Sequence, residues 1–207
     1  MAEATSTDEH TDQPADRPTH QQGGPRLARD YAHRPERLRP LLALWDTSVD
    51  ELFARLEGVD DTEWTWEPGP GARTVRRVDG SWVHDRPGPF GGPPGVRALA
   101  WTAGHLAEMG LLRADWTTGS HRLEPDGTPW PGTAAEGLAF LRHGLDAWRR
   151  TLDQVDDEDL DTVGRSAFAH GLDPHLPLID IAWWNTRELV HHAADLMTVR
   201  DLYAVRG

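Results

Sequence analysis

Residues 179–206 read IDIAWWNTRELVHHAADLMTVRDLYAVR. At about 100° per residue, Glu188 and His192 fall one turn apart on the same face of a helix, and Asp195 lies almost directly above Glu188. Apolar residues continue that face on both sides, as they do in a helix that packs against a core. The pattern predicts one helix over about 178–205 whose core-facing stripe carries ionisable groups.

Ionisable side chains on a core-facing stripe need partners, because burying an unpaired charge costs several kcal/mol. A metal ion is the simplest partner here, since it neutralises the carboxylate of Glu188 and also coordinates the imidazole of His192. A plainer alternative is that Glu188 and His192 pair with each other on a solvated face.

A second predicted helix, residues 95–117, carries the same anomaly. His105 lies near the middle of its apolar stripe, which consists of Ala98, Trp101, Met109, Leu112 and Trp116. Glu108 is about 60° off that line. If His105 is not simply a hydrogen-bonded core histidine, the two stripes together offer two imidazoles and one carboxylate.

Two imidazoles and one carboxylate form a known zinc ligand set that leaves a position open for water or substrate. One interpretation of the residues is that His105, Glu188 and His192 bind one divalent metal, and the core histidine and the solvated pair stay open as alternatives at this point. Zinc comes first, and nickel, iron(II) or manganese suit the same ligands.

Two further amphipathic segments, about 34–59 and 133–155, complete the helical pattern. Four such segments without a convincing strand pattern predict an all-α four-helix bundle. The connections of about 35, 15 and 20 residues are long, and long loops in compact domains are often functional. The first of them contains a short run, 73–78, that is compatible with an extended conformation.

The composition narrows the range of functions. The net charge is −13, which repels phosphate backbones and argues against nucleic-acid binding. There is no cysteine, so a thiolate metal site is excluded. Residues 1–28 are polar and lack an apolar stretch, and no segment is long enough to span a membrane. We expect a cytoplasmic protein with a disordered tail over 1–28 and one domain over 29–207.

Three segments together resemble one family. They are LEGVDDTEWTWEP at 56–68, AWTAGHLAEM at 100–109 and WWNTRELVHHAADLMTVRDLY at 183–203. Their order and spacing are similar to those of the DinB-like superfamily of metal-binding helical bundles. That superfamily includes mycothiol-dependent maleylpyruvate isomerases and thiol S-transferases, and the resemblance covers roughly residues 36–205.

The resemblance implies an up-up-down-down bundle, often dimeric, with a metal held by three side chains. Carried over residue by residue, the family's ligands fall on His105, Glu188 and His192. Many relatives have histidine where this chain has Glu188, and the glutamate form resembles the mycothiol-dependent isomerases. Asp195 matches a polar position that we expect to support a ligand.

The leading hypothesis is an enzyme that uses the metal to activate a thiol or a water for attack on a small molecule. Because the chain has no cysteine, the thiol would come from a cosubstrate such as mycothiol. Glu108 and Asp195 are the candidate catalytic residues, as proton relays or as groups that fix a histidine tautomer. We expect the loop with Trp82, His84 and Phe90 to line the substrate pocket.

Two other functions stay open from the sequence. One is a metal-dependent hydrolase or tailoring enzyme that needs no thiol cosubstrate. The other is a metal or small-molecule binding protein without turnover.

Overall fold

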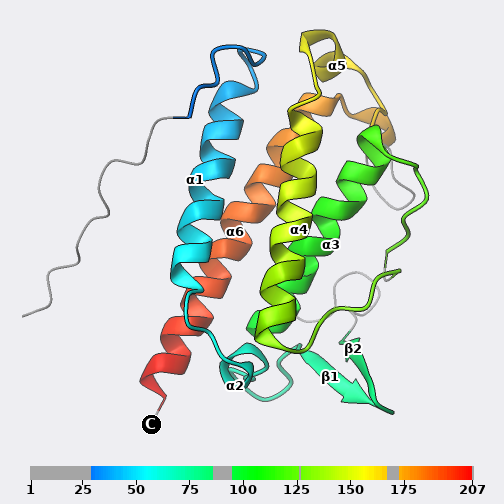
Figure 1. Ribbon diagram of the computed structural model, residues 1–207. Coiled ribbons are helices and arrows are strands. Elements are labelled where there is room, and N and C mark those ends of the chain that lie inside the picture. The colour runs from blue at the N-terminus through cyan, green and yellow to red at the C-terminus, as the bar shows by residue number, and fades with distance from the viewer. Residues whose placement is uncertain (1–28, 86–94, 126, 167–172, 207) are drawn as a thin grey trace, which may run out of the picture.

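The chain folds into a mostly helical domain. The computed structural model describes residues 29–85, 95–125, 127–166 and 173–206. The predicted tail, 1–28, and Phe90 therefore lie outside the described residues. Four long helices pack side by side along their lengths: α1 (Arg39–Arg55), α3 (Leu99–Thr118), α4 (Ala134–Leu152) and α6 (Leu178–Val205) (Figure 1). These are the four helices expected from the periodicity, and the structure is mostly helical, as the predicted all-α class requires.

The core between these helices is built mainly from leucine and tryptophan. Helix α3 is buried on most sides, because it contacts both α4 and α6. Trp45, Trp64 and Trp148 are among the largest fully buried side chains. None of the helices in the described part of the chain is long and apolar enough to cross a bilayer.

The directions of the helices differ from the expected up-up-down-down order. Arg55 and Asp201 form an ion pair that joins the carboxyl ends of α1 and α6, so these two helices run parallel. The hydroxyls of Thr118 and Thr151 lie 3.5 Å apart at the carboxyl ends of α3 and α4, which also run parallel. Since α3 and α6 are antiparallel, the order along the chain is up-down-down-up (Figure 1).

The connection over 119–133 explains this correction. It leaves the carboxyl end of α3 and returns along the bundle to the amino end of α4 (Figure 1). About 15 extended residues reach roughly 50 Å, whereas a helix as long as α3 spans only about 30 Å. A connection of this length is therefore long enough to place α3 and α4 parallel, but its length alone does not predict that arrangement.

A β-hairpin precedes α3, where the sequence showed no convincing strand pattern. Strand β1 (Val75–Val78) pairs with β2 (Ser81–His84) in antiparallel register. Asp79 and Gly80 connect the strands with φ values of 49° and 84°. Two positive φ values at an Asp-Gly pair are typical of the two-residue hairpin turn that suits the strand twist. The extended run expected near 73–78 was the first half of this hairpin.

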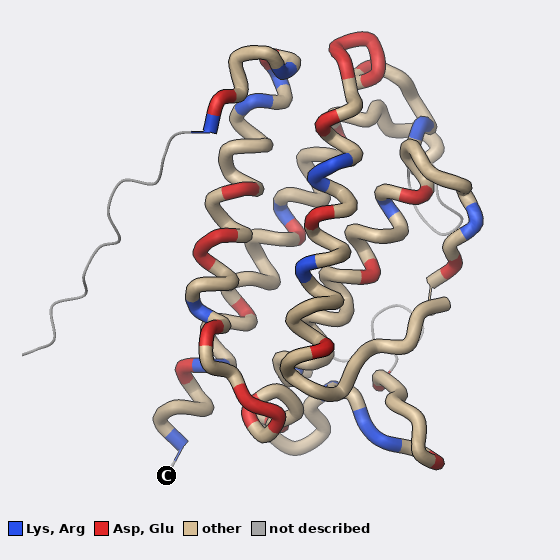
Figure 2. The backbone as a smooth tube through the Cα atoms, in the orientation of Figure 1, with Lys and Arg blue, Asp and Glu red and all other residues tan. Residues whose placement is uncertain are grey.

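Three short elements complete the described chain: α2 (Asp61–Trp64), α5 (Asp157–Asp161) and a 3₁₀ turn, η2 (Asp173–His175). Asp60 caps α2 and Asp156 caps α5, each by accepting a bond from a backbone N–H three residues on. Acidic residues gather on these two short helices, at opposite ends of the bundle (Figure 2).

Helices α3 and α4 touch through their backbones at two glycines. A Cβ added to Gly110 would lie 2.3 Å from the carbonyl oxygen of Gly144, and one added to Gly144 would lie 2.2 Å from that of Ala107. Real side chains do not tolerate such distances. The contact places α3 deep in the domain, so residues on its opposite face are directed toward α6.

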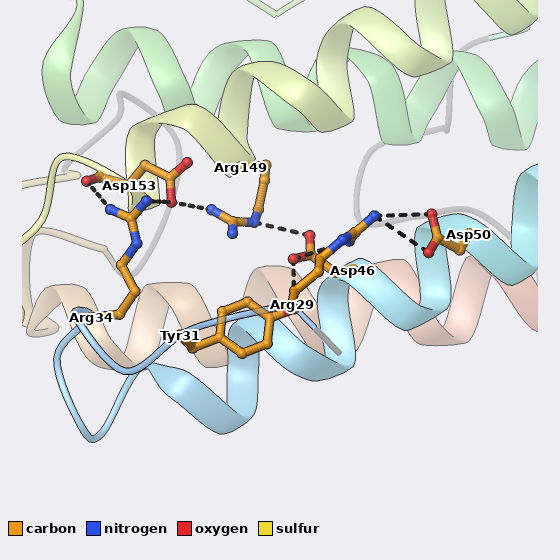
Figure 3. A network of polar contacts seen from close by, with 7 residues as sticks. All are labelled: Arg29, Tyr31, Arg34, Asp46, Asp50, Arg149 and Asp153. Carbon is orange, nitrogen blue, oxygen red and sulfur yellow. Dashed lines mark hydrogen bonds and ion pairs between the residues drawn. The ribbon is translucent and has the colours of Figure 1, made fainter. Parts of the chain in front are cut away.

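A charged network fastens residues 29–34 to the bundle (Figure 3). Asp46 of α1 is buried and accepts a hydrogen bond of 2.8 Å from the hydroxyl of Tyr31. The same carboxylate lies 3.1 Å from Nη1 of Arg29 and 2.9 Å from Nε of Arg149 on α4. Residues 29–34 are thus part of the packed domain, and the boundary at residue 28 stays a prediction from the sequence.

Candidate metal centre

His105, Glu188 and His192 meet in the interior of the bundle. His105 lies near the middle of α3, and the other two lie one turn apart on α6. One ligand atom from each of the three residues lies within 4.8 Å of the others. The antiparallel packing of α3 and α6 therefore brings together the three residues that the sequence had placed on two core-facing stripes.

The spacing of these groups suits a small divalent ion. Nε2 of His192 is 3.4 Å from Oε2 of Glu188, and the rings of His105 and His192 meet edge to face with centroids 4.9 Å apart. Zinc bonds of about 2.0–2.2 Å in tetrahedral geometry separate neighbouring ligand atoms by roughly 3.3–3.6 Å. The pair of Glu188 and His192 matches this spacing, and the three ligand atoms as a group lie within 4.8 Å of one another, so they would close by up to about 1.5 Å around such an ion.

The environment favours the protonation states that bind metals. Burial lowers the pKa of His105 to about 4, and the neighbouring His192 and Arg97 act in the same direction. A hydrogen bond from His192 lowers the pKa of Glu188, against the opposing effect of burial. The site therefore offers a neutral imidazole and a carboxylate anion, the forms in which these side chains coordinate metals.

Neighbouring side chains contact both histidines and orient their rings. Nδ1 of His192 lies 3.1 Å from Oδ2 of Asp195, one of the two candidate catalytic residues. The indole of Trp101 stacks on the ring of His105, with centroids 5.5 Å apart and planes 18° from parallel. Contacts of this kind orient ligands in metal sites.

A family model described as the DinB superfamily matches residues 44–196, about three quarters of the chain. The chain belongs to this superfamily. The matched region runs from α1 into α6 and contains all three residues of the candidate metal centre. No curated protein and no solved structure matches the chain.

A pocket of about 200 Å³ opens beside the candidate metal centre of this DinB-superfamily protein. It is lined by His105, Glu108, Met109, Leu112, Arg113, Pro125 and Trp184. Its walls are mainly apolar, and Arg113 is almost fully buried in them, with its guanidinium over the Trp184 ring. Of the two candidate catalytic residues, Glu108 faces this pocket and Asp195 is not among its described lining residues.

A chain of aromatic ring contacts connects the hairpin to His105. His84 of β2 stacks on Trp130 at 3.8 Å, and Trp130 meets the edge of Trp101, which covers His105. His84 thus supports the centre through other rings, and neither it nor Trp82 is among the described lining residues of the pocket. Sequence reasoning missed Trp130, whose one signal was a bulky aromatic in a loop otherwise rich in proline and glycine.

Proposed function

We propose that this DinB-superfamily protein is a metal-dependent enzyme in which His105, Glu188 and His192 hold one divalent ion. Zinc is the first choice, and nickel, iron(II) or manganese suit the same ligand set. The observation that supports the proposal is the convergence of two imidazoles and one carboxylate in the interior of the bundle. Three protein ligands leave room for a reactant, as in catalytic rather than structural sites.

The reaction proposed is the attack of a thiol cosubstrate on a small molecule, as in mycothiol-dependent transferases and isomerases. A divalent ion, when bound, lowers the pKa of a coordinated thiol or water so that a nucleophile forms near neutral pH. The thiol comes from a cosubstrate because the chain has no cysteine. Glu108, which lines the pocket next to His105, accepts the proton of the nucleophile.

Asp195 has a different role from Glu108 in this proposal. With the ion bound, its carboxylate would accept a hydrogen bond from Nδ1–H of His192. Nε2, which contacts Glu188 in the metal-free protein, would then carry no proton and would bind the ion. The apolar walls at Met109, Leu112 and Trp184 bind the carbon skeleton of a small substrate and exclude water around it. The homodimer and the cytoplasmic location stay predictions from the sequence.

A metal-dependent hydrolase is the second candidate. The observation in its favour is again Glu108, because a carboxylate at the pocket accepts a proton from water as readily as from a thiol. In that case no thiol cosubstrate binds, and the pocket accepts an ester or amide.

Elemental analysis of the purified protein tests the metal site first. Melting temperatures are then measured with and without zinc, each with mycothiol and with a simpler thiol. We expect thiols to stabilise only the zinc-loaded form, and Glu108→Gln to keep the metal while losing turnover.

Each other outcome selects an alternative. Turnover of simple esters or amides without any thiol effect favours the hydrolase. Tight metal binding without turnover of either kind favours a binding protein. A protein that binds no divalent ion contradicts the proposal altogether.

A further inference from the structure

Arg97 lies just before α3 and contacts both sides of the metal centre. Its Nη1 is 3.2 Å from Oδ2 of Asp195, and the same oxygen is 3.1 Å from Nδ1 of His192. Its guanidinium carbon lies 5.3 Å from the ring centroid of Trp101, which stacks on His105. One side chain therefore contacts the two groups that hold the two histidines.

The backbone beside Arg97 is itself fixed. The N–H of Ala98 donates to the carbonyl of Arg73 at 2.8 Å, and the N–H of Arg73 donates to Val96 at 3.1 Å. The Arg97 side chain is 31% exposed, against 51% for Asp195. An exposed aspartate changes rotamer at little cost. Arg97 and His192 both contact Oδ2 of Asp195, and of these two Arg97 comes from a segment outside α6, so it fixes the carboxylate relative to the rest of the bundle.

The hydrogen-bonding capacity of the Arg97 guanidinium is only partly used. Its Nε is buried and has no hydrogen-bond partner among the described residues. A buried donor that neither protein nor water satisfies costs stability, so such a group calls for an explanation. The side chain directs its Nη1 to Asp195 in spite of this cost.

We propose that Arg97 is a positioning residue of the metal centre, an inference that rests on the proposed function. By holding the Asp195 carboxylate against Nδ1 of His192, Arg97 favours the tautomer that carries its proton on Nδ1, whereas Glu188 favours a proton on Nε2. The Nδ1 tautomer leaves Nε2, the nitrogen beside Glu188, available to the ion. Arg97 and Asp195 have opposite charges, so together they orient a ligand without changing the net charge of the site. The guanidinium also covers Trp101 and limits the motion of that indole.

Three variants distinguish a role of Arg97 in positioning the metal ligands from a general contribution to the stability of the fold. Arg97→Met keeps an apolar stem over Trp101 but removes the guanidinium, and Arg97→Lys restores a cation beside Asp195. Arg200→Met is the matched control, because Arg200 also joins α6 to a neighbouring segment, with its Nε 3.3 Å from Glu63. It lies about two turns beyond the last ligand on α6.

Two measurements apply to all three variants and the parent. Zinc affinity is obtained by competition with a chromophoric chelator. The tautomer of His192 is read from ¹⁵N-edited NMR spectra of the metal-free protein above pH 8. We expect Arg97→Met to weaken zinc binding at least about tenfold, as the loss of a ligand's support commonly does. We also expect it to mix the His192 tautomers, and we expect Arg97→Lys to restore most of both properties.

The results that contradict the role of Arg97 differ from those that contradict the metal site itself. A parent protein that binds no zinc removes the proposed function. If the parent binds zinc, an Arg97→Met affinity within twofold of the parent overturns the role of Arg97, as does an equal loss in Arg200→Met. An unchanged His192 tautomer in metal-free Arg97→Met overturns it without reference to any ion.

Discussion

Changing Glu188 to glutamine removes the one negative charge among the three residues of the metal centre while preserving the shape of the side chain. Without metal the effect on stability should be small, because glutamine can still accept a hydrogen bond from His192, and the other partner, Arg187, is 44% exposed in a pair of a kind that contributes up to about 1 kcal/mol. For a domain of this size, 1 kcal/mol corresponds to about 2–4 °C in melting temperature. The metal-free variant should therefore melt close to the metal-free parent.

With metal the melting temperatures of the parent and of Glu188→Gln should differ. At a free zinc concentration of 100 times the parent's Kd, binding stabilises the parent by about 2.7 kcal/mol, or roughly 5–11 °C. A ligating carboxylate should contribute at least about tenfold to affinity. The same zinc concentration then stabilises Glu188→Gln by only about 1.4 kcal/mol, or roughly 3–6 °C.

The assay is a thermal unfolding series with a zinc titration for each variant. Glu188→His should lose less affinity than Glu188→Gln, because imidazole suits the same metals. Glu51→Gln, which alters an exposed carboxylate of α1, is the control and should match the parent. If Glu188→Gln binds zinc as tightly as the parent, Glu188 is not a ligand, and its contact with His192 is an ordinary pair within one helix.

Three other changes test further parts of the structure. Metal-free protein should lose stability as the pH falls from 6.5 to about 4, because burial lowers the folded-state pKa of His105 and the unfolded chain binds its proton first. Urea denaturation at stepped pH should show a shallower loss for His105→Gln. Gly144→Ala should cost at least about 1–3 kcal/mol, because its methyl group forces α3 and α4 apart. Gly69→Ala, whose added Cβ meets an ordinary contact at 3.7 Å, is the control, and equal losses would contradict the close packing. Deleting residues 1–28 should change the melting temperature by no more than about 2 °C. Deleting 1–34 also removes part of the charged network and should cost about 2 kcal/mol or more, roughly 4–8 °C, so equal effects of the two deletions would refute the anchoring of residues 29–34.

The helices and the three grouped residues were predictable from the sequence, because both depend on local periodicity. Glu188 and His192 conflict with the apolar stripe of their own helix, and His105 conflicts with that of another. Each of these ionisable residues can be recognised within its own helical segment. The ionisable residues of the other helix are the natural partners, because all of them can bind the same metal ion. Periodicity could therefore suggest that the three residues meet, and the resemblance to the DinB-like superfamily favoured this over a core histidine and a solvated pair.

The remaining features depend on contacts between segments far apart in the chain. The return of the 119–133 connection, the chain of ring contacts from His84 through Trp130, and the contact of Arg97 with Asp195 have no local pattern. The hairpin is an exception, because Asp79 and Gly80 between two short runs were a local turn signal that could have been used.

The contact between Gly110 and Gly144 also bears on how distant relatives of this protein can be recognised. Metal ligands are lost or exchanged when chemistry changes, and motifs built on them then fail. A backbone contact without room for a methyl group restricts two helix positions to glycine, or nearly so, whatever reaction the bundle performs. A glycine five residues after the α3 histidine, paired with one near the middle of the following long helix, should thus mark descendants that kept this scaffold after their catalytic residues diverged.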